Sequence, residues 1–244
     1  MALLEIKNVN KNFGGLTAVM DFDFRIERNE IVGLIGPNGA GKTTIFNLLT
    51  GVYPADSGDI IFNEKSITKF RTHEICEEGI GRCFQIVKPF GDISVLENVL
   101  VGAFCRIDNL HDAKQRSMEV LEFVKLEHKK DALAKNLTIA DKKRLEMARA
   151  LATKPQLLLL DEVMAGLNPK ETEDTISLVR KLRENGITLF IIEHVMRVIM
   201  TLADRVCIIH HGRKIVEGEP KIVTQDQRVI KAYLGEAYAS ARAK

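Results

Sequence analysis

The sequence predicts an α/β protein that combines a core of buried strands and helices with an antiparallel β subdomain and a helical insert subdomain. Three observations lead to this fold class. Several short apolar runs lack alternation, which is typical of strands that are buried on both faces. Residues 21–27 alternate between charged and apolar side chains, as a strand with one solvated face does. Between about 94 and 152, apolar residues recur at helical spacing.

The elements follow each other in an order that supports this division. Residues 3–9 predict a first strand, and the alternating segment at 22–26 predicts a second strand of an antiparallel sheet. The run at 31–35 predicts a buried strand that ends at Gly36, and a helix is expected at 43–50, closed by Gly51. Further strands are expected at 59–62, 81–85, 157–160, 188–192 and 205–209, and a helix at 169–184.

Length and composition are those of one domain with a lobe. The chain has 244 residues, of which 45% are hydrophobic, so it is long enough to bury a sizeable core. We expect a single domain over 1–244, in which 1–89 and 153–244 form the core with its antiparallel β subdomain and 90–152 form the helical insert.

The charge balance and the hydropathy pattern exclude some functional classes. A formal net charge of +2 is too balanced for a strongly basic nucleic-acid-binding protein. No stretch approaches the roughly 18 apolar residues of a membrane span, and the N-terminus has no apolar signal core. The four cysteines, at 76, 83, 105 and 207, form no C-x-x-C pair and are expected to be reduced thiols.

The segment after the buried strand at 31–35 matches G-x-x-x-x-G-K-[ST] in full and precedes a predicted helix. Glycines let the backbone wrap closely around a phosphate, and the helix N-terminus adds partial positive charge. Lys42 is expected to reach the β- and γ-phosphates, and the Thr43 hydroxyl to bind Mg²⁺. The predicted ATP-binding residues here are Gly36, Pro37, Asn38, Gly39, Ala40, Gly41, Lys42, Thr43 and Thr44.

A second acidic motif ends the apolar strand at 157–160 with Asp161 and Glu162. Ligands of open α/β sheets bind at the carboxyl ends of strands, so these carboxylates are expected to lie beside the phosphate-binding loop. We expect Asp161 to hold Mg²⁺ and Glu162 to act as the general base toward the attacking water.

Together these motifs resemble the ATP-binding-cassette (ABC) ATPases over nearly the whole chain, which implies a P-loop NTPase core of ABC type. Phe13 resembles the aromatic residue that stacks on adenine in that family. Gln85 resembles the Q-loop glutamine that senses Mg²⁺ and water. His194, at the end of a strand, resembles the H-loop histidine that contacts the γ-phosphate.

The segment 137–141, Leu-Thr-Ile-Ala-Asp, departs from the family signature Leu-Ser-Gly-Gly-Gln. The resemblance implies that it caps the nucleotide of a second cassette and makes 90–152 a helical signature subdomain. Thr138 keeps the hydroxyl, and Ala140 keeps an N–H while its Cβ restricts the backbone. Asp141 places a negative charge at the helix start, which favours the helix and disfavours a nearby phosphate.

Details of the motifs are similar to one subgroup, the ATP-binding subunits of branched-chain amino acid uptake transporters. They include Val163 and Asn168 after the acidic motif and the tail segment 229–236. The resemblance implies an ATPase with Mg²⁺, a second cassette, permease subunits, indirectly a solute-binding protein, and a peripheral place on the cytoplasmic face of the inner membrane.

Two points about partners follow from the same resemblance. Exposed apolar residues around Phe90, Ile93 and Val95 are candidate permease contacts, although packing within the insert would account for them equally well. A different solute importer, a lipid-type exporter, a cassette without useful turnover and an ABC ATPase of DNA repair or translation remain alternatives.

Overall fold

The computed structural model describes residues 2–229, and the chain folds into two compact units. The first unit contains 2–72 and 188–229, and the second contains 73–187. The second unit is therefore inserted, in the sequence, between the two segments that form the first unit.

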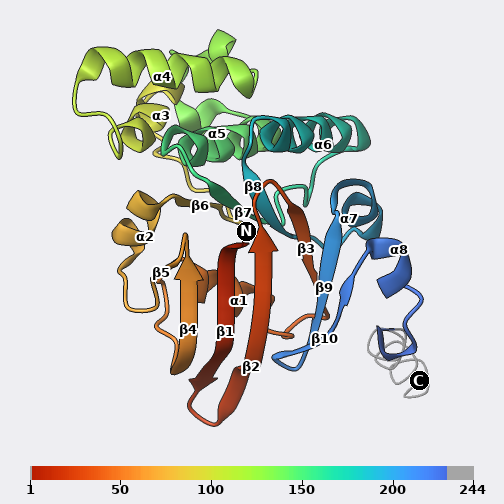
Figure 1. Cartoon of the computed structure of the whole chain (residues 1–244). Helices are drawn as coiled ribbons and strands as arrows, with labels where there is room; N and C mark the ends of the chain where they lie inside the picture. The colour runs from red at the N-terminus through yellow and green to blue at the C-terminus, as the bar shows by residue number, and fades with distance from the viewer. Residues whose placement is uncertain (1, 230–244) are drawn as a thin grey trace. The chain divides into compact units, whose positions relative to one another are not determined.

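The first unit contains an antiparallel sheet with the strand order β2-β1-β4-β5 (Figure 1). Its strands are β1 (Ala2–Phe13), β2 (Leu16–Glu27), β4 (Ser57–Phe62) and β5 (Lys65–Ser66). Along β2, Phe22, Phe24 and Ile26 are buried while the residues between them reach solvent. The antiparallel sheet predicted from this alternation is confirmed.

The same unit contains a mixed set of strands, in the order β10-β9-β3-β8, of which β9, β3 and β8 are parallel. Strand β3 (Ile31–Ile35) lies between β8 (Thr188–Ile192) and β9 (Arg205–His210) and is parallel to both. Strand β10 (Arg213–Gly218) pairs antiparallel with β9. The buried runs thus form strands where the sequence predicts them.

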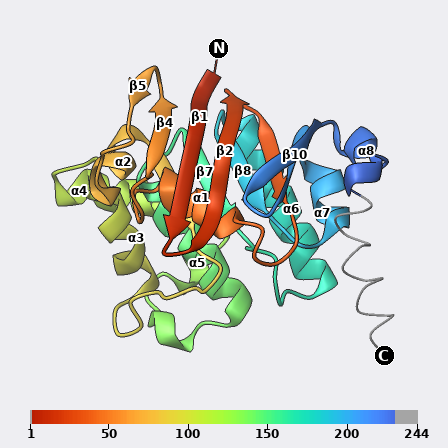
Figure 2. The ribbon, with the colours of Figure 1, turned by 90° about the horizontal axis from the view of Figure 1, so that it is seen from below.

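Three helices complete the first unit. They are α1 (Lys42–Leu49), α7 (Met196–Leu202) and α8 (Pro220–Val223), and α8 lies against α7, β9 and β10 (Figure 2). The core includes Phe190 of β8, whose ring centroid lies 5.1 Å from that of Phe46 in α1 and 5.6 Å from that of Phe24 in β2. These rings connect both sheets of the unit and the helix that follows the glycine-rich loop.

The second unit joins two parallel strands to a group of helices. Strand β6 (Ile80–Cys83) pairs with β7 (Leu157–Asp161), so that Cys83 lies opposite Leu160. The helical elements are α2 (Thr72–Glu78), α3 (Val95–Ala103), α4 (Leu110–Phe123), η1 (Glu127–Lys129), η2 (Ala134–Asn136), α5 (Ile139–Ala152) and α6 (Pro169–Glu184). Helix α3 packs against α4 and α5 (Figure 1).

Local sequence signals determine where these helices begin. Ser94 and Glu97 form a capping box at α3, and Asn168 and Glu171 form another at α6, where Pro169 occupies the first turn. The Asn109 side chain caps α4 by accepting a hydrogen bond from the Asp112 N–H, without a reciprocal bond of the capping-box kind. The expected helical region near 94–152 and the helix at 169–184 are confirmed.

Two local expectations need correction or addition. Strand β6 ends at Cys83, so the strand expected to reach Gln85 is two residues too long, and Gln85 lies in the following loop. Helices α2 and α7 and strand β10 were not predicted, because each is short and partly exposed. Among residues 2–229, no helix combines the length and the apolar character that a bilayer crossing requires.

Candidate nucleotide site

Strand β3 leads directly into the glycine-rich loop, and two of its glycines are sterically required. A Cβ on Gly36 would fall on the carbonyl oxygen of Ile209, and a Cβ on Gly41 would fall on that of Ala18. Gly41 also has a φ of 104°, which side-chain-bearing residues rarely adopt. The loop is pressed against two neighbouring segments of backbone, which hold it in shape.

Lys42, the first residue of α1, points back into this loop. Its Nζ donates to the carbonyl oxygens of Gly36 at 2.6 Å and Pro37 at 2.9 Å, and the residue is buried. The first N–H groups of a helix have no carbonyl partner within the helix. In α1 the first backbone hydrogen bond runs from the Ile45 N–H to Gly41 O, at 3.0 Å. An ammonium group and the start of a helix therefore converge where an anion would be held.

The other residues of the predicted cradle lie in the same loop. Asn38, Gly39 and Thr43 are exposed, Thr44 is half-buried, and Ala40 is buried. The Ala40 N–H donates to Pro37 O at 3.2 Å, and its carbonyl accepts from the Gly212 N–H at 3.0 Å. Thr43 is thus accessible to an incoming ligand.

Phe13 ends β1 and leaves part of its ring open to solvent. The ring meets Tyr53 edge-on with centroids 5.1 Å apart, and Lys11 Nζ lies 5.5 Å from its centroid. An exposed aromatic face of this kind suits stacking against a nucleobase. Tyr53 was not singled out from the sequence, because no motif marks it.

His194 is the second residue after the end of strand β8. The preceding Glu193 is buried and His194 is exposed, so the imidazole lies at the surface where the strand ends. This is the place that the order of motifs predicts for it.

In the second unit, β7 ends at a buried ion pair. Arg82 Nη2 of β6 lies 2.7 Å from Asp161 Oδ2, and the two side chains are only 5% and 3% exposed. Arg82 was missed from the sequence, since an arginine within a short strand carries no distinctive signal. The parallel pairing of β6 and β7 brings it to the carboxylate.

The other carboxylate oxygen of Asp161 is relevant to the predicted Mg²⁺ site. Asp161 Oδ1 is buried and has no hydrogen-bond partner among residues 2–229. No group of three or more His, Cys, Asp or Glu side chains gathers as a metal site in this part of the chain either. A single hard oxygen donor fits Mg²⁺, which binds through one or two carboxylates and completes its shell with water and phosphate oxygens.

The side chain of Glu162, the residue after Asp161, contacts the side chain of Gln85. Gln85 Nε2 donates to Glu162 Oε2 at 2.6 Å, across 77 residues of sequence. Glu162 has a φ of 50°, which is uncommon for a residue with a side chain and turns the chain sharply after β7. The two predicted residues are thus brought together.

Lys143 of α5 supports this turn, and sequence reasoning did not identify it. Its Nζ donates to the carbonyl oxygens of Glu162 at 3.3 Å, Val163 at 3.0 Å and Ala165 at 2.6 Å. The helix that starts in the signature segment is therefore tied to the acidic motif. Asn168 caps α6 through the Glu171 N–H at 2.9 Å, which explains an asparagine there in local terms.

In the signature segment, the side chains of Thr138 and Asp141 are hydrogen-bonded to each other, and Asp141 also pairs with Lys129. Thr138 caps α5: its hydroxyl accepts from the Asp141 N–H at 3.2 Å and donates to Asp141 Oδ2 at 2.9 Å. Lys129 Nζ lies 2.6 Å from the same oxygen. Burial alone would raise the pKa of Asp141, but the hydrogen bonds from Lys129 and Thr138 outweigh it and hold that pKa below its usual value. The carboxylate expected to oppose a phosphate is therefore buried and paired, and Ala140 lies half-buried beside it.

The three candidate permease contacts differ in exposure. Phe90 is 49% exposed, with Arg149 over its ring at 4.8 Å, and Ile93 is half-buried. Val95 is fully buried, so its assignment as an exposed contact is wrong. It is the first residue of α3, where the capping box turns it into the packed side of the helix.

Comparison with known proteins agrees with this geometry. The family model described as ABC transporter matches residues 19–165, and the one described as Branched-chain amino acid ATP-binding cassette transporter matches 213–239. The second match includes the whole of the tail segment 229–236, which lies outside the described residues from 230 onward.

Curated relatives resemble the chain over nearly its full length. The high-affinity branched-chain amino acid transport ATP-binding protein BraF of Pseudomonas aeruginosa is 38% identical, covering 96% of this chain and 98% of the relative. LivG of Escherichia coli K12, with the same description, is 37% identical with the same coverage. The lipopolysaccharide export system ATP-binding protein LptB of the same strain is 35% identical, covering 98% of this chain and 99% of the relative.

Among solved structures, the ADP conformation of MJ1267, an ATP-binding cassette of an ABC transporter, superposes with a TM-score of 0.87. It is 32% identical and covers 96% of this chain and 99% of its own. Fold, loop and acidic motif define a nucleotide-binding ATPase of the P-loop class. The chain belongs to the ABC transporter family, as an ATP-binding cassette. The fold class, the enzyme class and the resemblance to the branched-chain amino acid subgroup are confirmed.

Proposed function

We propose that this chain is the ATP-hydrolysing subunit of a transporter that imports branched-chain, hydrophobic amino acids through separate permease subunits. The match of residues 213–239 to the branched-chain amino acid cassette family carries the choice of solute, and the relatives described above support it. The whole of 1–244 acts as one ABC ATPase domain, with 90–152 as its helical signature subdomain.

In this proposal the first unit binds ATP. The loop N–H groups, Lys42 and the start of α1 hold the phosphates, and Phe13 stacks on adenine. Mg²⁺ would be held by Thr43, Asp161 and Gln85 and would neutralise charge on the phosphate oxygens. The Oδ1 of Asp161, which has no hydrogen-bond partner among residues 2–229, and the exposure of Thr43 support this ligand set.

The residues around Glu162 would carry the hydrolytic step. Glu162 acts as general base toward the attacking water, and its 2.6 Å contact with Gln85 holds the carboxylate in one orientation. His194 contacts the γ-phosphate. Lys143, which holds three carbonyl groups of the turn, is a positioning residue.

A second cassette completes the site in the proposed cycle. Thr138 and Ala140 of one chain would approach the nucleotide bound by the other through backbone N–H groups at the start of α5. Because the Thr138 hydroxyl is occupied by Asp141, these N–H groups matter more than the hydroxyl. The complex would sit on the cytoplasmic face of the inner membrane and would also involve a solute-binding protein.

Export of a lipid-type molecule is the second candidate. It rests on the 35% identity to LptB over almost the full chain, close to the identity with BraF and LivG.

Two substitutions test the ATPase assignment. Lys42→Ala should abolish ATP binding, whereas the exposed Lys69→Ala should leave it intact. Glu162→Gln should retain nucleotide affinity and lower turnover about a hundredfold or more, which is the usual contribution of a general base. Glu173→Gln, the control, should leave turnover unchanged. Normal turnover in Glu162→Gln would mean that another group is the base.

Co-purification tests the transporter assignment. Tagged Glu162→Gln protein would be isolated with ATP from its own host's membranes, and its partners identified by mass spectrometry. Recovery of permeases together with an amino acid-binding protein is expected. Recovery of lipid-export components would favour the second candidate, and recovery of neither would contradict both.

A further inference from the structure

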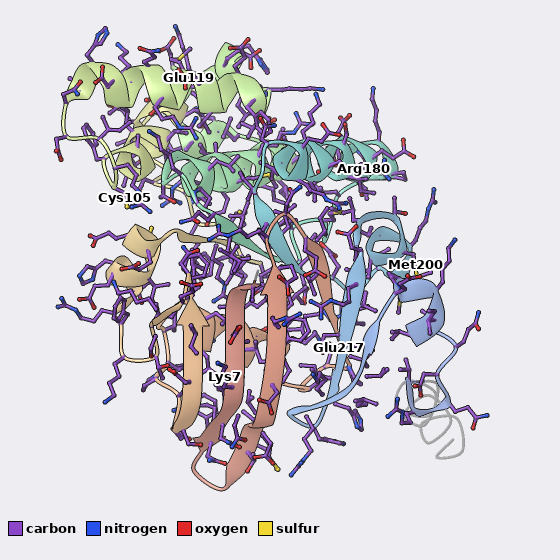
Figure 3. The ribbon with its side chains drawn as sticks, viewed as in Figure 1. Lys7, Cys105, Glu119, Arg180, Met200 and Glu217 are labelled. Atoms are coloured by element: carbon purple, nitrogen blue, oxygen red, sulfur yellow. The ribbon has the colours of Figure 1, made fainter. Side chains whose placement is uncertain are left out.

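The second unit contains a cavity that plays no part in the proposed nucleotide chemistry. Its volume is about 450 Å³, within the range of small-molecule sites. It lies between α4, the end of α5 with the loop that follows, and the end of α6 with the loop that follows. Helix α4 carries Glu119, which is labelled in Figure 3.

Three kinds of side chain line this cavity. Arg116 and Lys154 supply positive charge, and Glu119 supplies negative charge. The remaining wall is largely apolar and includes Val120, Phe123 and Leu182. The cavity therefore combines cations, an anion and an apolar wall.

Arg116 is incompletely satisfied by the protein. Its Nη2 donates to Leu151 O at 3.3 Å, and its Nη1 lies 3.6 Å from Glu119 Oε2, both long contacts. Its Nε is buried and meets no hydrogen-bond acceptor within the described part of the chain. A buried, unsatisfied donor on a charged group is costly, so a ligand carboxylate would be favoured here.

We propose that this cavity binds a small zwitterionic amino acid with an apolar side chain. The ligand carboxylate would pair with Arg116 and Lys154, its ammonium with Glu119, and its side chain with the wall formed by Val120, Phe123 and Leu182. Glu119 can take this role because its side chain is 53% exposed and its contacts are long: Oε2 lies 3.6 Å from Arg116 Nη1, and Oε1 accepts from Gln115 Nε2 at 3.2 Å.

The position of the cavity gives such binding a route to the motifs. Helix α5 begins at Thr138 in the signature segment and α6 begins at Asn168, and both helices end at the cavity. An imported amino acid bound there would report its own accumulation to the cassette. This regulatory role rests on the proposed function, whereas the binding site itself does not.

Equilibrium dialysis of the full-length chain with radiolabelled L-leucine tests the site. Saturable binding with one site per chain is expected. Arg116→Gln and Glu119→Gln should each weaken it about tenfold, as loss of a charged hydrogen bond does. The exposed Lys114→Gln and Glu122→Gln, on the same helix, are matched controls that should bind as the original chain does.

Competition with leucine analogues separates the three contacts. Isoamylamine lacks the carboxylate, 4-methyl-2-oxopentanoate lacks the ammonium, and glycine lacks the apolar side chain, and each should compete at least about tenfold more weakly than L-leucine. Absence of saturable binding, or unchanged binding in both Arg116→Gln and Glu119→Gln, would overturn the proposal. Because Glu119 is more exposed than Arg116, its variant keeps the test valid if Arg116→Gln fails to fold.

The same dialysis with Glu162→Gln protein separates this inference from the proposed function. Leucine binding should persist in that variant, since the cavity does not include Glu162. Failure of the transporter assignment with intact leucine binding would remove only the regulatory role.

Discussion

Replacing Arg82 by methionine should strongly destabilise the second unit. The substitution keeps an apolar stem of similar length and removes the guanidinium that lies 2.7 Å from Asp161 Oδ2. Both side chains are at most 5% exposed, so water does not replace the lost partner. Removing one member of a buried ion pair typically costs about 3–5 kcal/mol, because the remaining charge is left without compensation.

That cost can be measured as a change in melting temperature. For a chain of this size about 1 kcal/mol corresponds to about 2–4 °C, so Arg82→Met should lower Tm by about 6–20 °C in differential scanning calorimetry. Adding Asp161→Asn should recover part of the loss, since it removes the uncompensated charge.

A less buried ion pair in the same unit provides the control. Arg144 Nη2 and Asp174 Oδ2 are 3.3 Å apart, with side chains 24% and 45% exposed, so Arg144→Met should cost about 0–1 kcal/mol. If Arg82→Met were no more destabilising than Arg144→Met, or if Asp161→Asn gave no recovery, the argument from a buried charge pair would be wrong.

Three further predictions concern the signature segment, the cysteines and the start of α6. The pKa of Asp141 is lower in the folded chain than in the unfolded chain, so this carboxylate stabilises the fold above about pH 4 and loses that contribution as pH falls through its folded pKa. As the pH is lowered from 6 to 3, the urea midpoint of Asp141→Asn should therefore fall less steeply than that of the original chain. Parallel curves would contradict the pairing. Burial and the neighbouring Cys105 raise the pKa of Cys76 to about 11, so at pH 7.5 iodoacetamide should alkylate Cys76 roughly a hundredfold more slowly than an unperturbed thiol, as peptide mass spectrometry would show; labelling at the free-thiol rate would refute it. Asn168→Ala should cost about 1 kcal/mol in chemical denaturation and Asn168→Asp much less, because aspartate also caps; equal losses would exclude the cap as the cause.

The nucleotide-binding motifs and most core elements were predictable because their signals are local. A buried strand, a glycine-rich loop and a helix start occupy one stretch around 31–50, and the spacing of glycines, Lys42 and Thr43 is set by contact with a phosphate. The strand that ends at Asp161 and Glu162 is equally continuous. For the same reason the strands at 31–35 and 188–192 and the helix at 169–184 have the bounds that the sequence predicts.

Contacts between distant segments could not be predicted in this way. The pairing of Arg82 with Asp161 spans 79 residues and depends on the parallel register of β6 and β7. Val95 was expected at the surface but is buried. The packing of the helices decides whether a residue faces the core or solvent, and the apolar character of Val95 alone does not indicate this.

The sequence by itself thus determined the class of this protein, its fold class and the chemistry of its motifs, because each depends on residues adjacent in the chain. Only the tertiary structure decided which charges are compensated: Asp161 by Arg82, and Asp141 by Lys129. It alone also revealed the cavity beside Arg116. The physical reason is that burial and pairing arise where separate segments meet, and no local pattern records which segments those are.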